Sequence, residues 1–173
     1  MPVIKIEDAN DAVPLAKALC EGGLPCAEVT FRTEAAEAAI QTMREAYPDM
    51  LLIAGTVLTK EQADRAVSAG AQAVVSPGFN RKVVDYCVRK GILILPGCSC
   101  PSDMEQAIEA GLSAVKFFPA EASGGIKAIQ AMAAPYGQLR FMPTGGVNAV
   151  NMQEYLKNDK VLPAAVPGWC RKS

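Results

Sequence analysis

The sequence of 173 residues contains no histidine. Histidine is the side chain most often used as a general base near neutral pH, and it is the commonest zinc ligand. If the chain is an enzyme, its chemistry must rest on lysine, glutamate, aspartate, threonine, tyrosine or cysteine.

Charge of one sign and long apolar runs are missing as well. The formal net charge is -1 and no basic stripe occurs, so nothing favours a nucleic-acid partner or an anionic membrane surface. No apolar run approaches the roughly 20 residues of a membrane span, and the start MPVIKIED has neither the basic region nor the apolar core of a signal peptide. These absences predict a cytoplasmic protein.

Cysteine is present, but without an informative spacing. The distances between the six cysteines match no zinc module, and the chain is not a short secreted one. We expect free thiols in a reducing compartment, and we regard a redox or metal pair at Cys98 and Cys100 as the weaker alternative. The cysteines are Cys20, Cys26, Cys87, Cys98, Cys100 and Cys170.

Short apolar or β-branched runs alternate with segments of helical pattern along the whole chain. The runs predict strands at residues 2–6, 26–31, 51–57, 73–78, 92–97, 114–120 and 140–146, and a weaker one near Val161. Helices are predicted at residues 8–20, 34–46, 60–69, 81–90, 102–110, 126–133 and 148–157. Apolar strands flanked by helices indicate a parallel sheet that is covered on its faces.

The number of strand–helix units favours a closed barrel over an open sheet. Seven units are clear and an eighth begins, which fits a (β/α)8 TIM-type barrel in a single domain over residues 1–173. A doubly wound sheet is the alternative, but it usually carries a glycine-rich phosphate loop after its first strand. Here the first strand is followed by the glycine-free run EDAN.

Lys116 is the most unusual residue of the predicted strands, because apolar residues flank it on both sides in AVKFFP. Burying an ammonium group is costly, and removal from water favours the neutral amine. A neutral amine in a dry pocket attacks carbonyl groups, as Schiff-base catalysis requires. The alternatives are a lysine that reaches solvent at the strand end, or a structural ion pair with Glu28.

Other polar residues also come at strand ends, where barrel enzymes place their functional groups. Glu28 is a candidate for proton transfer or for the counter-ion of Lys116 or Arg32. Arg32 is a candidate for binding a carboxylate or phosphate, unless it is simply a solvated loop residue. Thr56 and Thr144 end two further strands.

Gly145 and Gly146 follow Thr144, and Asn148 then begins a predicted helix. Glycines let backbone N–H groups approach an anion, and a helix N-terminus favours negative charge. Phosphate sites of barrels commonly follow strands seven and eight. The segment therefore resembles a phosphate site, although a Gly-Gly pair can also be only a tight turn.

Together these segments resemble the 2-keto-3-deoxy-6-phosphogluconate (KDPG) aldolases. The matching stretches are PVIKIEDANDAVPLAKAL, AEVTFRTEAA, IAGTVLT, AVVSPGF, VKFFPAEASGG and FMPTGGVNAVNMQEYL. The resemblance implies a trimeric class I aldolase that cleaves its substrate to pyruvate and glyceraldehyde 3-phosphate without a metal or a cofactor. Many members also act on 4-hydroxy-2-oxoglutarate.

The resemblance also implies roles for individual residues. Lys116 matches the Schiff-base lysine, and Glu28 matches the carboxylate that moves protons through a water molecule. Thr144 matches a hydroxyl beside the keto acid. The residues that match substrate-binding positions are Arg32 and Thr56 for the carboxylate, Pro77, and Gly145 and Gly146 for the phosphate.

The sequence departs from the family pattern at its two ends. Members usually have a helix before PVI, and their eighth strand resembles VLACGGSW, whereas this chain ends in VLPAAVPGWCRKS. Deleting one G from codons for VLACGGSWMVPQE yields that ending, so we interpret residues 161–173 as a frameshifted tail in place of the eighth strand and helix. Alternatives to the active KDPG aldolase are an impaired remnant, an aldolase for the galactonate epimer, and a phosphate-binding barrel with other chemistry.

Overall fold

The structure is a computed structural model that describes residues 1–162 and 166–167. Its strands pair in parallel throughout, in the orders β5-β4-β3-β2-β1-β9 and β6-β7-β8. The strands are β1 (Pro2–Ile4), β2 (Cys26–Thr30), β3 (Leu51–Gly55), β4 (Ala73–Val75), β5 (Ile94–Leu95), β6 (Gly97–Cys98), β7 (Ala114–Phe117), β8 (Arg140–Pro143) and β9 (Val166–Pro167).

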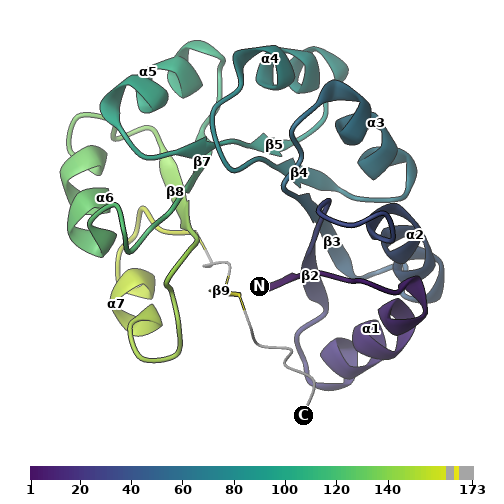
Figure 1. Cartoon of the computed structure of the whole chain (residues 1–173). Coiled ribbons are helices and arrows are strands. Elements are labelled where there is room, and N and C mark those ends of the chain that lie inside the picture. Colours follow the sequence, from purple (N-terminus) through teal and green to yellow (C-terminus); the bar gives the residue numbers. More distant parts are fainter. Residues whose placement is uncertain (163–165, 168–173) are drawn as a thin grey trace.

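Helices follow the strands in turn and form an outer ring around them (Figure 1). They are the 3-10 helix η1 (Ala9–Asp11) and the α-helices α1 (Ala12–Glu21), α2 (Ala36–Ala46), α3 (Lys60–Ser68), α4 (Arg81–Lys90), α5 (Pro101–Glu109), α6 (Gly125–Ala133) and α7 (Met152–Leu156). Among the residues that the structure describes, no helix is long and apolar enough to cross a membrane.

The ring of strands closes through the segment that follows α7. Val161 forms a parallel bridge with Phe141 of β8, and the Leu162 N–H donates to the Phe141 carbonyl at 2.8 Å. On the other side, β9 pairs with β1. The predicted (β/α)8 barrel is confirmed. The prediction of an aberrant tail concerns residues 161–173, most of which lie outside the described residues.

Strand alternation separates residues that pack between the strands and the helices, in two clusters, from a smaller cluster inside the barrel. Leu52, Ala54 and Val74 face outward and pack with helix residues such as Ile40 and Met43. Ile53, Ala73, Val75, Leu95 and Met142 form a separate cluster. Because successive side chains of a strand point to opposite faces, this smaller cluster fills the inside of the barrel.

Several strands and helices begin or end at other residues than predicted, for local chemical reasons. The fifth strand is interrupted at Pro96, which has no N–H for the ladder, and becomes β5 and β6. The first predicted helix begins as η1 before α1. The helix predicted at residues 148–157 was wrong at its start, because α7 begins only at Met152. The Asn148 side chain accepts from the N–H groups of Val150 and Asn151, and such local bonds compete with helix formation.

Candidate active site

Lys116 and Glu28 meet inside the barrel. Glu28 lies opposite Val3 and Ile53 in the ladder, and Lys116 lies opposite Gly97 and Met142. The Lys116 Nζ atom is 3.4 Å from Glu28 Oε1, and the two side chains are only 7% and 1% exposed. The predicted pairing of these groups is therefore present, although 88 positions separate them in the sequence.

Gly55 at the end of β3 makes room for the Glu28 side chain. A Cβ atom on Gly55 would lie 2.8 Å from Glu28 Cγ and closer still to Oε1. No side chain other than hydrogen fits there without moving the carboxylate. Gly55 thus fixes the path by which Glu28 reaches Lys116, a role that was not among those predicted from the sequence.

Two buried oxygen atoms at this end of the barrel have no hydrogen-bond partner among the described residues. They are Glu28 Oε2 and Thr144 Oγ1. Leaving a buried polar atom unpaired costs about 1–3 kcal/mol. Unpaired oxygens next to a buried amine are therefore characteristic of a site that holds a polar ligand or water. Lys116 Nζ also lies over the Phe118 ring, 5.3 Å from its centroid.

Thr144, Gly145 and Gly146 follow β8 and lie against the segment after β7. The Thr144 N–H donates to the Phe117 carbonyl at 3.0 Å, and the Ala120 N–H donates to the Thr144 carbonyl at 2.8 Å. Gly145 and Gly146 have φ angles of 94° and 83°, in the region that favours glycine. This loop therefore has a conformation that other residues would strain.

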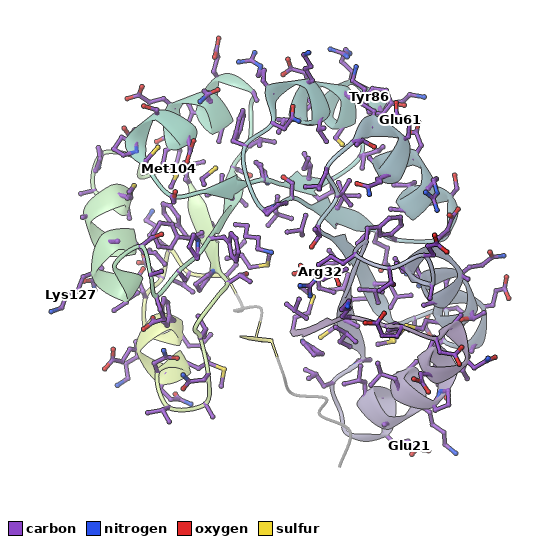
Figure 2. All side chains as sticks on the ribbon, viewed as in Figure 1. Glu21, Arg32, Glu61, Tyr86, Met104 and Lys127 are labelled. Atoms are coloured by element: carbon purple, nitrogen blue, oxygen red, sulfur yellow. The ribbon has the colours of Figure 1, made fainter. Side chains whose placement is uncertain are left out.

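Arg32, Thr56 and Pro77 follow β2, β3 and β4 at the same end of the barrel. None of the three is hydrogen-bonded or ion-paired to Lys116 or Glu28 in the structure. The side chain of Arg32 lies on the inner side of the helix ring (Figure 2), and its Nε donates to Thr30 Oγ1 at 3.2 Å. Its guanidinium has no carboxylate partner in the described part of the chain.

The backbone and the surface around these residues support a binding role. Thr56 has a φ of 56°, the only positive value at a non-glycine residue in the described part of the chain. For a β-branched residue this conformation is strained, and such strain concentrates at functional sites. Arg32 lines a hollow of about 770 Å³ and Pro77 lines one of about 310 Å³, but neither Lys116 nor Glu28 lines either of them, so these hollows do not by themselves mark the site.

The cysteines that the structure describes are free thiols. Cys98 is buried at the end of β6, and burial raises the pKa of its thiol, so this group stays neutral. Cys100 is exposed. Within residues 1–162, no cluster of three or more potential metal-binding side chains occurs.

Comparison with known proteins identifies the family. The model of the KDPG and KHG aldolase family matches residues 1–171 of the chain. The chain belongs to this family. It is 52% identical to the 2-dehydro-3-deoxy-phosphogluconate aldolase of Treponema pallidum, over 94% of this chain and 77% of that protein. It is 43% identical to the KHG/KDPG aldolase of Escherichia coli K12, over 94% of this chain and 76% of that protein.

Solved aldolases of the family have the same fold. KDPG aldolase of Legionella pneumophila, with pyruvate captured as a covalent carbinolamine intermediate, superimposes with a TM-score of 0.92 at 39% identity. The alignment covers 97% of this chain and 81% of that one. The aldolase of Zymomonas mobilis superimposes with a TM-score of 0.91 at 42% identity and covers 97% and 80%.

Proposed function

We propose that this chain is a class I aldolase that cleaves KDPG to pyruvate and glyceraldehyde 3-phosphate through a Schiff base on Lys116. It also cleaves 4-hydroxy-2-oxoglutarate (KHG) to pyruvate and glyoxylate. The observation that carries the proposal is the buried Lys116 amine beside the Glu28 carboxylate, one oxygen of which has no partner among the residues that the structure describes. Family membership and the carbinolamine of the Legionella relative support the same chemistry.

The reaction needs an amine that attacks and a group that moves protons. The Lys116 amine adds to the C2 carbonyl of the substrate, and loss of water gives an iminium. The C4 hydroxyl then loses its proton, the C3–C4 bond breaks, and its electron pair enters the iminium to give an enamine. Protonation at C3 and addition of water release pyruvate and restore the amine.

Glu28 moves these protons. Its Oε1 faces Lys116, while Oε2 has no partner among the described residues and can bind one water molecule at the reacting carbon. A carboxylate in this position can accept the proton of the C4 hydroxyl and later supply one to C3. The Thr144 hydroxyl, which also has no partner in the described part of the chain, lies beside the keto acid and hydrogen-bonds to it.

Groups around the barrel mouth bind the rest of the substrate. As the family resemblance implies, Arg32 and Thr56 hold the carboxylate of the pyruvyl part, and Pro77 forms part of the wall; all three follow strands at the same end of the barrel. The amides of Gly145 and Gly146 bind the phosphate, for which their positive φ angles turn the backbone. The phosphate thus lies on the side of β8, whereas the carboxylate lies on the side of β2 and β3.

The assembly and compartment follow from the family resemblance and the composition. We propose a homotrimer, in which exposed apolar residues such as Leu58, Leu93 and Val150 supply contact area. We also propose a reducing compartment, the cytoplasm, because it suits free thiols. Size-exclusion chromatography with light scattering measures the mass of the assembly, and a homotrimer should have three times the mass of one chain.

Borohydride reduction in the presence of pyruvate tests the Schiff base. We expect one reduced adduct per chain, and peptide mapping should place it at Lys116. Lys116→Ala should abolish the adduct. Lys5→Ala is the matched control, because Lys5 is also paired with a glutamate, Glu7, but is exposed; this variant should be labelled as before. Labelling of a folded Lys116→Ala protein would refute the role of Lys116.

Glu28→Gln separates proton transfer from Schiff-base formation. General acid–base catalysis contributes roughly 10²–10⁴-fold, so we expect kcat to fall by about that factor. The pyruvate adduct should still form on Lys116, because its amine is still present. Steady-state turnover and adduct mass are the two measurements. Normal turnover of Glu28→Gln would mean that Glu28 acts only as a counter-ion.

A further inference from the structure

Glu121, four residues after β7, is connected to the Gly145–Gly146 loop by its backbone. Its N–H donates to the Gly145 carbonyl at 3.0 Å, next to the bond from the Ala120 N–H to the Thr144 carbonyl. The segments that follow β7 and β8 are therefore joined beyond the ends of their strands. The proposed mechanism assigns no task to the Glu121 side chain.

Two glycines make room for that side chain. A Cβ atom on Gly146 would lie 2.5 Å from Glu121 Cγ and 2.6 Å from its Cβ. A Cβ atom on Gly125, at the start of α6, would lie 3.2 Å from Glu121 Oε1 and 3.3 Å from the Tyr155 hydroxyl. The aliphatic part of Glu121 thus covers the Cα of Gly146, and its carboxylate passes beside Gly125.

Tyr155 of α7 holds the far end of Glu121. Its hydroxyl donates to Glu121 Oε1, and the residue is 1% exposed. Burial, and then the hydrogen bond to Glu121, raise the pKa of Tyr155, so the hydroxyl stays protonated and donates throughout the neutral range. The pair joins α7 to the segment after β7, across the glycine loop.

The Gly146 peptide is held on its carbonyl side as well. The side-chain amides of Asn148 and Asn151 both donate to the Gly146 carbonyl at 3.2 Å. With Glu121 on its Cα, Gly146 has little freedom to turn. The direction of the following amide is therefore fixed before any ligand binds, which lowers the cost of ordering the loop on binding.

We propose that Glu121 and Tyr155 are positioning residues that hold the Gly145–Gly146 loop in the conformation that binds the substrate's phosphate. The inference rests on the proposed function, in which this loop is the phosphate site. Neither side chain touches the reacting atoms. The pair therefore controls the preference for phosphorylated over unphosphorylated substrates, and it acts on KM more than on kcat.

Tyr155→Phe tests the pair because it removes one oxygen and keeps the buried ring. We expect KM for KDPG to rise about tenfold, the equivalent of a hydrogen bond to a charged group. KM for KHG, which has no phosphate, should change by about twofold or less. Glu121→Ala should raise KM for KDPG further. Glu121→Gln should restore most of the loss, because it keeps both the aliphatic part and an acceptor oxygen.

Tyr136→Phe is the matched control. The Tyr136 hydroxyl also donates to a glutamate, Glu105, at 3.1 Å. Tyr136, however, precedes β8 and lies at the opposite end of the barrel from the glycine loop. This variant should leave the ratio of the two KM values unchanged. Equal KM increases for both substrates in Tyr155→Phe, or the same ratio shift in Tyr136→Phe, would overturn the proposal.

Calorimetric titration with inorganic phosphate gives a measurement that does not depend on catalysis. The dissociation constant should rise about tenfold in Tyr155→Phe and not in Tyr136→Phe. An unchanged constant in Tyr155→Phe overturns the positioning role. If pyruvate forms no adduct on Lys116 but the phosphate constants shift as expected, the aldolase proposal fails and the positioning role stands.

Discussion

At the scale of single residues, the site depends as much on missing atoms as on reactive ones. A Cβ on Gly55 would clash with the Glu28 side chain that reaches Lys116, and a Cβ on Gly146 would clash with the Glu121 side chain that reaches Tyr155. A buried carboxylate held in one position pays no reorganisation cost during proton transfer, which favours catalysis. The glycines are therefore part of the proposed active site although they carry no functional group.

Gly55→Ala is predicted to reduce turnover through Glu28. The new methyl group would displace the carboxylate, so we expect kcat to fall by about 10²-fold or more, within the range for loss of a general base. Overpacking should also lower the free energy of unfolding by about 1–3 kcal/mol. Steady-state assays and urea denaturation measure the two effects.

Gly137→Ala is the control for this substitution. A Cβ there would meet only the Ala133 carbonyl, at the ordinary distance of 3.9 Å, so both quantities should stay close to those of the unchanged chain. Turnover of Gly55→Ala within twofold of that chain would mean that Glu28 has another way to reach the amine.

Residues whose charge is unusual in their sequence context could be predicted from the sequence. Lys116 and Glu28 stand out because charged groups are costly in apolar strands, and the structure brings them together. Gly55 and Tyr155 carry no charge that an apolar strand or helix would make costly, so they did not stand out in this way, although a glycine within a strand can indicate a close approach. Their roles depend on neighbours that only the register of β2 with β3 and the packing of α7 define.

At the scale of elements, α7 is joined to the barrel mainly by one buried ring and its hydroxyl. Tyr155 is the buried residue of this short helix, whereas α2 buries four. Its contact with Glu121 therefore carries much of the attachment. The sequence predicted the existence of this helix but not its start, because the competing hydrogen bonds of Asn148 involve side-chain orientation rather than composition.

The raised pKa of Tyr155 predicts how the stability of the protein depends on pH. An acid whose pKa is higher in the folded than in the unfolded state stabilises the fold fully below the unfolded value, about 10 for tyrosine. This contribution is lost as the pH rises toward the folded value, by up to about 1.4 kcal/mol per pH unit. We therefore expect the free energy of unfolding to fall between pH 10 and 11 partly through Tyr155.

Comparison with Tyr155→Phe isolates this effect from the other groups that titrate at high pH. Urea denaturation of both proteins from pH 7 to 11 should show a constant difference up to about pH 9, and a smaller one above pH 10. Curves that stay parallel over the whole range would show that folding does not raise the pKa of Tyr155.

At the scale of the whole molecule, the function depends on closing the ring of strands. The alternation of apolar runs with helical segments, and the number of strand–helix units, predicted the barrel. This pattern reflects strands that are buried on both faces of a parallel sheet. The sequence pattern could not predict how the ring of strands closes. Val161 bridges to β8, and β9 pairs with β1, so the contact between β9 and β1 joins residues from opposite ends of the chain.

Replacing residues 161–173 with VLACGGSWMVPQE is predicted to raise stability and to lower KM for KDPG. Pro163 and Pro167 have no N–H, and a strand with neighbours on both sides uses those donors. Each restored bond contributes about 1 kcal/mol, or roughly 2–4 °C in Tm for a chain of this size. The resemblance implies that the Gly-Gly-Ser of the family pattern binds the phosphate, so its amides and hydroxyl should lower KM for KDPG more than KM for KHG.

A second replacement, VLACAAAWMVPQE, separates folding from phosphate binding. It restores the same N–H groups without the Gly-Gly-Ser, so it should raise Tm about as much but leave the ratio of the KM values for KDPG and KHG near that of the unchanged chain. Thermal denaturation and assays with both substrates distinguish the cases. Equal KM gains for KDPG and KHG in the first replacement would mean that residues 161–173 act only through folding. No gain in Tm or KM would show that the barrel closes equally well with the present sequence.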